Sequence, residues 1–278
     1  ATVLNLRSLR SSPPPGMDGI YEAEGYSKSQ EYIRVQSKFG LTIGFLKLIA
    51  FLIFWVVGGF NYIDQAVRII GFNEITNGIL FFGMFAAVAT IINIPVDLYA
   101  TFVIEERFGF NKTNYKTFFF DAVKSIVLTA VIGVPVLSGV LFFFEYTGTL
   151  SWVYASLFAA GITLIISVIA PIWIMPIFNK FTPLESGVLR EAIVQYTRSV
   201  DFTYGNTYVI DGSKRSAHSN AFFTGFGRTK RIALFDTLID QLSVDEIVSV
   251  IAHEVGHNKK KHTISGMVLG IAHVVVLL

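Results

Sequence analysis

Long apolar runs separated by short polar segments dominate the pattern of this chain. Four runs contain at least the roughly 20 residues that a helix needs to cross about 30 Å of hydrocarbon. They cover residues 41–60, 75–96, 122–144 and 150–178. A fifth run, 264–278, falls short of that length. One run alone can form a buried core helix, but four in series predict an α-helical multi-pass membrane protein.

The positively charged residues support one topology. Residues 1–40 carry five Lys or Arg, 61–74 carry one, 97–121 carry three, 145–149 carry none and 179–252 carry eight. Because loops rich in Lys and Arg stay on the cytosolic side, the last of these segments is predicted to face the cytosol. The net charge of +2 therefore reflects topology and gives no reason to expect a nucleic-acid partner. The lack of Cys excludes disulfides and thiolate metal sites.

The pattern after residue 178 is that of a small soluble unit. An amphipathic helix is predicted over 184–200, and short β-branched or aromatic runs at 204–211, 217–226 and 231–235 predict antiparallel strands. Ser243 followed by Glu246 is a capping box, so a helix is expected to begin there. The fold class is thus a helical membrane protein with a small α/β unit of antiparallel strands on the cytosolic side.

That last helix carries the residues of greatest chemical interest, His253-Glu254-Val255-Gly256-His257. Residues four apart on a helix share one face, so both imidazoles can bind one zinc ion. Zinc lowers the pKa of bound water to about 7, and Glu254 is positioned to act as the general base. The Lys residues at 259–261 place the motif at the boundary between membrane and cytosol. Two His and a Glu without a metal are the plainer alternative.

Catalytic zinc usually has three protein ligands and one open position. A continuous helix would rotate His262 to roughly the opposite face from His253 and would also turn His273 away, so packing is the expected role of both. The extended metzincin pattern is excluded because it needs other residues than Lys260 and Thr263. Residues 258–278 hold no Asp or Glu. His218 lies in a predicted strand, and we expect it to form hydrogen bonds rather than to bind the metal. In the zinc peptidases that use a Glu ligand, the third ligand is a carboxylate farther along the chain, and residues up to 278 do not complete such a site.

The segment 211–227 alternates small polar and aromatic residues between two turns that contain glycine. An exposed edge strand beside the helix of the two histidines could bind an extended peptide by strand addition. An ordinary hairpin strand is the equally weighted alternative.

Four segments resemble motifs of one protein family and occur in the same order as in that family. They are Lys28–Tyr32, Glu105–Thr113, Ile174–Pro183, and Asp211–Asp236 leading to the two histidines. The chain closely resembles the type I CAAX prenyl proteases, integral-membrane zinc endopeptidases whose helices surround a large internal chamber. The resemblance implies an N-terminal membrane domain over 1–182, with a polar leader over 1–40, and a peptidase domain over 183–278. It also suggests an internal fragment that lacks the family's first and last membrane helices.

Residue by residue, the resemblance implies that His253 and His257 bind one zinc ion and that Glu254 is the catalytic base. It implies that the strand with Asn220, Ala221 and Phe222 binds the substrate, and that a Glu after Leu278 completes the metal site. The implied reaction is peptide hydrolysis, which in eukaryotic members removes the last three residues of proteins prenylated at a C-terminal Cys. The implied partners are the lipid bilayer and a protein or peptide substrate, prenylated or hydrophobic at its C-terminus.

Two other functions stay open on the residues alone. An intramembrane zinc protease would place the motif inside an apolar helix, which the Lys residues at 259–261 oppose. An inactive scaffold or substrate-binding module would keep the metal site without turnover. The expected location is the bacterial inner membrane, or the endoplasmic reticulum membrane in a eukaryote.

Overall fold

The predicted apolar runs form long helices. The structure is a computed structural model that describes residues 2–14, 16, 22–225 and 230–277. Among these residues, four helical stretches are long and apolar enough to cross a membrane: Ala23–Val56, Glu74–Phe108, Tyr115–Tyr146 and Gly148–Phe178. Their most apolar stretches bury no residue inside the protein, as expected for surfaces that lipid covers. The predicted multi-pass architecture is confirmed.

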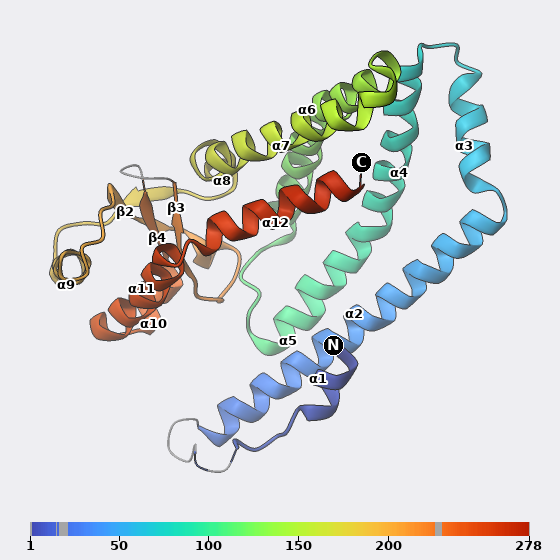
Figure 1. The fold of residues 1–278 in the computed structure, drawn as a ribbon. Coiled ribbons are helices and arrows are strands. Elements are labelled where there is room, and N and C mark those ends of the chain that lie inside the picture. Colours follow the sequence, from blue (N-terminus) through green and yellow to red (C-terminus); the bar gives the residue numbers. More distant parts are fainter. Residues whose placement is uncertain (1, 15, 17–21, 226–229, 278) are drawn as a thin grey trace. The chain divides into compact units, whose positions relative to one another are not determined.

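The chain divides into two units, Ala1–Asn111 and Lys112–Leu278. The first unit contains these elements: α1 (Thr2–Ser8), α2 (Ala23–Val56), α3 (Gly59–Arg68), α4 (Glu74–Tyr99), the π-helical η1 (Ala100–Glu105) and α5 (Glu106–Phe108). α2 is continuous, so the end of the predicted polar leader and most of the first apolar run form one helix (Figure 1).

Polar contacts join α2 to the helices that follow it within the first unit. The hydroxyl of Tyr32 donates a hydrogen bond to Glu105, and Arg107 forms an ion pair with Glu31. Deeper along α2, Lys47 donates to the side-chain oxygen of Asn93. The first two segments of the family resemblance, 28–32 and 105–113, therefore meet through these side chains.

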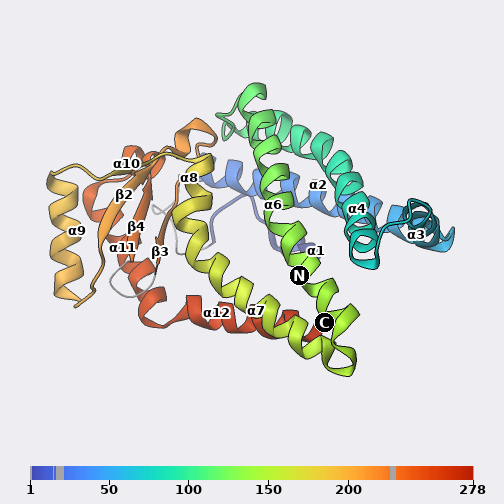
Figure 2. The same cartoon turned by 90° about the horizontal axis from the view of Figure 1, so that it is seen from above.

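The second unit begins with two membrane helices and continues into a small domain. Its elements are α6 (Tyr115–Tyr146), η2 (Gly148–Leu150), α7 (Ser151–Ile169), the π-helical η3 (Ala170–Ile174), α8 (Met175–Phe178), β1 (Phe181–Pro183), α9 (Val188–Ser199), β2 (Asn206–Ile210), η4 (Gly212–Lys214), β3 (Ala221–Thr224), β4 (Arg231–Phe235), α10 (Asp236–Gln241), α11 (Val244–Lys259) and α12 (His262–Leu277). α12 packs beside α7 (Figure 2).

α6 and α7 pack closely at Gly139 of α6, which has no side chain to separate the two helices. A Cβ on Gly139 would lie 2.4 Å from the ring of Phe158. The same ring packs on Phe143, with 5.7 Å between ring centroids. Small residues commonly allow such close approach between membrane helices, because dispersion contacts replace the hydrophobic effect in lipid.

The four strands form one sheet in the order β1-β2-β4-β3. β1 pairs antiparallel with β2, and β3 antiparallel with β4, but β2 and β4 are parallel. The prediction of a wholly antiparallel unit was therefore wrong at the centre of the sheet. The chain passes from β2 through η4 to the far edge and returns through β3, which brings β4 beside β2 in the same direction. β1, built on Phe181–Pro183, was not predicted.

One apolar core joins the sheet to its helices. Residues from α9, β4, α10 and α11 fill it together with Phe202 and Ala221, the central ones being Ile193, Ile232, Leu234, Leu238, Ile247, Ile251 and Val255. Burial of these side chains stabilises the fold by roughly 1.5–3 kcal/mol for each large one. The core fixes α11 against β3 and α9, which positions the face of α11 that the histidines occupy.

Candidate metal centre

α11 begins where the sequence predicted. The carboxylate of Glu246 accepts a hydrogen bond from the backbone N–H of Ser243 at 2.8 Å and one from its hydroxyl at 2.7 Å. These hydrogen bonds lower the pKa of the Glu246 carboxyl, because both favour its charged form. The capping box is thus confirmed, and both histidines lie well inside the helix that it starts.

His253 and His257 project from the exposed side of α11. Ile247, Ile251 and Val255 bury the opposite side against the core. The Nε2 atoms of the two imidazoles face each other at 2.9 Å, and the ring planes are inclined at 71°. Two nitrogen ligands of one tetrahedral zinc ion lie roughly 3.3 Å apart. The pair therefore already converges on one point, as a shared metal ion requires.

Glu254 follows His253 by about 100° around the helix, toward the flank of the buried face. Its side chain is half-buried, whereas both histidines are exposed. Among the residues that the structure describes, no group of three His, Cys, Asp or Glu side chains is arranged to hold a metal. The third ligand expected beyond Leu278 stays a prediction.

The predicted orientation of His262, on roughly the opposite face from His253, was wrong, while its expected role in packing stays a prediction. Its Nδ1 atom lies 2.7 Å from Nδ1 of His257, and the two ring centroids are 4.8 Å apart. The prediction assumed one continuous helix, but α11 ends at Lys259 and the backbone of Lys261 has a φ of 57°. The left-handed backbone of Lys261 changes the direction of the chain before α12 begins at His262. The His262 ring therefore points back toward the histidine pair.

The predicted substrate segment lies beside α11 at an edge of the sheet. β3 contains Ala221 and Phe222 and begins four residues later than the sequence suggested, while Asn220 directly precedes it. Position 226, the predicted end of the strand, lies outside the described residues. β3 pairs only with β4 among the described strands, so one of its edges is open to strand addition.

The register shows which backbone groups face that open edge. The N–H of Phe235 donates to the carbonyl of Asn220 at 3.0 Å, so Asn220 is a residue whose backbone pairs with β4. Phe222 and Thr224 lie two and four residues further along and are inferred to pair with β4 in the same way. In an antiparallel pair, bonded and non-bonded residues alternate, so the N–H and C=O groups of Ala221 and Phe223 point outward. The side-chain oxygen of Asn220 accepts a hydrogen bond from the outward N–H of Ala221 at 2.8 Å.

Comparison with known proteins decides the family. Residues 2–180 match the family described as CAAX prenyl protease N-terminal, five membrane helices, and residues 183–278 match peptidase family M48. The chain belongs to the CAAX prenyl protease family. M48 peptidases are metalloproteases, so the family implies a metal.

Individual members of the CAAX prenyl protease family agree over most of the chain. The Saccharomyces cerevisiae CAAX prenyl protease 1 is 36% identical over 272 residues, which cover 94% of this chain and 60% of that protein. The Arabidopsis thaliana homologue is 38% identical, covering 94% and 65%, and the human homologue is 32% identical, covering 92% and 63%. The crystal structure of S. mikatae Ste24p matches with a TM-score of 0.90 and 35% identity, covering 99% of this chain and 65% of that chain. The chain thus spans 60–65% of the length of these relatives.

Sequence reasoning missed one polar cluster of this CAAX prenyl protease family member. Arg215, from the turn before β3, forms two hydrogen bonds with Asp121 of α6, at 2.7 and 3.1 Å, and one with Asn179 at 3.2 Å. The side chains of Arg215 and Asp121 are only 23% and 22% exposed. Asp121, an isolated acidic residue directly before an apolar run, was the available signal. The cluster fixes the segment that leads into β3 to a membrane helix.

A second contact supports the same segment. The carboxylate of Asp211 accepts from the backbone N–H of Lys180 at 2.6 Å. The next residue, Gly212, passes so close to Phe235 that a Cβ there would lie 2.6 Å from the ring. The last two segments of the family resemblance therefore meet around the turn that leads to β3.

Proposed function

We propose that this protein is a membrane-bound zinc metalloendopeptidase. The observation that carries the proposal is the convergence of Nε2 of His253 and Nε2 of His257 at 2.9 Å on an exposed helix face, beside an open strand edge. Two neutral imidazole nitrogens suit zinc as ligands. A carboxylate beyond Leu278 would be the third ligand.

Glu254 would serve as the general base. When bound, the zinc ion would supply a Lewis acid that makes water nucleophilic near neutral pH and polarises the scissile carbonyl. The carboxylate of Glu254 takes the proton from the attacking water and later delivers it to the leaving amine, as in other peptidases with this motif. Its half-buried position limits competing hydrogen bonds from bulk water.

The substrate would bind as an added strand along β3. The outward backbone groups of Ala221 and Phe223 would pair with an extended peptide. The Asn220 amide, which now accepts from the Ala221 N–H, would move aside or bridge to the peptide. Phe222 packs on Phe235, with 6.3 Å between ring centroids, and would support the strand from behind.

The proposed substrates are proteins with a prenylated C-terminal CAAX sequence, from which the last three residues are removed. The curated relatives carry the name CAAX prenyl protease, and a membrane-embedded enzyme suits a substrate that carries a lipid. The distribution of Lys and Arg supports an active site on the cytosolic side. The relatives are eukaryotic, which favours the endoplasmic reticulum membrane.

The decisive experiment compares two variants of the full-length protein with the wild type in detergent. Glu254→Gln is expected to retain stoichiometric zinc while the kcat on a farnesylated CAAX peptide falls by about 10²–10⁴-fold. His253→Ala is expected to lose both zinc and activity. Full activity of Glu254→Gln would refute its role as base. Zinc bound by a wild type without turnover would support a scaffold instead.

A further inference from the structure

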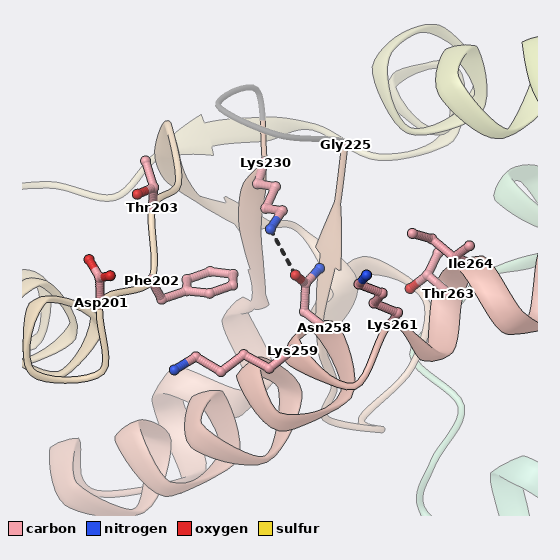
Figure 3. A pocket seen from close by; sticks show the side chains of 10 residues that line it. All are labelled: Asp201, Phe202, Thr203, Gly225, Lys230, Asn258, Lys259, Lys261, Thr263 and Ile264. Carbon is pink, nitrogen blue, oxygen red and sulfur yellow. Dashed lines mark hydrogen bonds between the residues drawn. The ribbon is translucent and has the colours of Figure 1, made fainter.

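A hollow of about 770 Å³ opens on the second unit beside the junction of α11 and α12 (Figure 3). The residues that line it come from the loop after α9, the end of β3, the start of β4 and the α11–α12 junction, and they do not include His253, Glu254 or His257. Three of them are lysines, Lys230, Lys259 and Lys261. The hollow is thus chemically distinct from the candidate metal centre.

Two of the lysines are held in place by contacts with the wall. Nζ of Lys230 donates to the side-chain oxygen of Asn258 at 2.8 Å and lies 4.8 Å from the centroid of the Phe202 ring (Figure 3). Nζ of Lys259 donates to the carbonyl of Val200 at 2.5 Å. Such anchoring reduces the side-chain entropy that a bound ligand would otherwise have to remove.

The lysines outnumber the carboxylates that line the hollow. Within the described part of the chain, none of the three forms an ion pair, although Asp201 also lines the hollow. Lys261 has a backbone φ of 57°, which is uncommon for a residue with a Cβ. Three lysines and one aspartate line the hollow, so its lining carries a net positive charge that an anion would relieve.

Apolar surface continues directly from the hollow. Thr263 and Ile264 line it and lie in the first turn of α12. Ile264 is 44% exposed, and Val268, which lies one helical turn further on the same side, is 58% exposed. A molecule with an anionic head in the hollow and hydrocarbon beside Ile264 and Val268 would satisfy both surfaces. A free phosphate would occupy only the basic hollow and would leave the apolar surface uncovered.

We propose that this hollow binds the phosphate-bearing headgroup of an anionic membrane phospholipid. Basic residues at the membrane surface attract such lipids, and the apolar helix α12, which packs beside the membrane helix α7, offers Ile264 and Val268 to the acyl chains. The site lies outside the proposed peptidase machinery and goes beyond the proposed function.

The test measures binding of a fluorescent phosphatidylinositol to the full-length protein in neutral detergent. Lys261→Asn removes one ammonium group with a residue that tolerates positive φ, and Lys230→Gln removes another. Each single variant is expected to bind about fivefold more weakly than wild type, and the double variant about 25-fold. Phosphatidylcholine should compete poorly.

Lys260→Asn is the matched control, since Lys260 belongs to the same basic run but does not line the hollow. It is expected to change the affinity less than about twofold. Equal loss in Lys260→Asn and Lys261→Asn would show diffuse attraction to positive charge and would overturn the site. Unchanged binding in all variants would overturn it as well.

Two further measurements identify the source of the phosphate. Ile264→Gln is expected to weaken phosphatidylinositol binding and to leave competition by inorganic phosphate unchanged. If inorganic phosphate competes at the same concentration as the lipid, the ligand is a free anion and the lipid assignment fails. Equal melting temperatures of all variants in neutral detergent would establish that each is folded.

Discussion

The rings of His257 and His262 meet through their Nδ1 atoms, which lie 2.7 Å apart across the break between α11 and α12. The Nε2 atom of His257 meanwhile faces His253. A partner on the second nitrogen of a metal-binding imidazole fixes its orientation and tautomer. We therefore infer that His262 would act as a positioning residue for His257 at the proposed metal site.

Removing that partner should weaken zinc binding. His262→Ala in the full-length protein is expected to lower zinc affinity by about 10–100-fold, measured by competition with a chelating dye. His262→Gln, which keeps a hydrogen-bonding side chain, should recover part of the loss. His273→Ala is the control, because His273 is also an exposed histidine of α12 and has no contact with the pair. Equal affinity in His262→Ala and wild type would exclude the positioning role.

The open edge of β3 predicts a second effect. Proline is tolerated in an edge strand where its missing N–H would face outward, which is the inferred position of Ala221. Ala221→Pro should therefore keep the hydrogen bonds between β3 and β4 but lose one hydrogen bond to an added peptide strand. We expect the kcat/KM to fall by about 3–10-fold, mainly through a higher KM.

Thr224→Pro is the control variant for Ala221→Pro. The N–H of Thr224 is inferred to pair with Arg231 of β4, so this variant should lower the melting temperature as well as activity. If Ala221→Pro unfolds the protein and Thr224→Pro does not, the assigned register is wrong.

The ion pair between Arg215 and Asp121 should contribute to stability. Its geometry is bidentate and partly shielded from water, so Arg215→Ala is expected to lower the free energy of unfolding by about 2–3 kcal/mol. Thermal unfolding in detergent measures this loss. Arg215→Lys should recover only part of it, because an ammonium group cannot reproduce the planar fork. If the loss in the double variant equals the sum of the losses in Arg215→Ala and Asp121→Ala, the two side chains are not energetically coupled.

The capping box predicts a dependence on pH. Hydrogen bonds from Ser243 lower the pKa of Glu246 below its usual value of 4.5. The carboxylate therefore stabilises the start of α11 at pH values above 4.5, and this stabilisation is lost as the pH falls through the lowered pKa. Amide hydrogen exchange in the first turn of α11 should accelerate over that range, after correction for the intrinsic rate. In Glu246→Gln this extra acceleration should vanish; its persistence would assign the effect to another group.

Much of the local structure could be predicted from the sequence. Four apolar runs predicted four long helices because a bilayer imposes length and composition on any helix that crosses it. Ser243 and Glu246 predicted the start of α11, and the four-residue spacing of His253 and His257 predicted their shared face. Each of these features depends on neighbours within a few residues, which a sequence pattern records directly.

Other features depended on contacts between distant segments. The parallel pairing of β2 with β4 follows from the path of the chain through η4 and β3, which strand propensities do not encode. Asp121 and Arg215 are far apart in sequence, so no local pattern joins them.

The sequence by itself therefore determined the membrane class, the histidine motif and the helix that carries it, because helix periodicity and bilayer thickness act locally. Only the tertiary structure decided the neighbour of His257 and the accessible edge of β3. One left-handed residue, Lys261, redirects the chain and brings His262 to His257, whereas a continuous helix would have turned it away. The free edge of β3 likewise exists because β4 lies inside the sheet, where core packing places it.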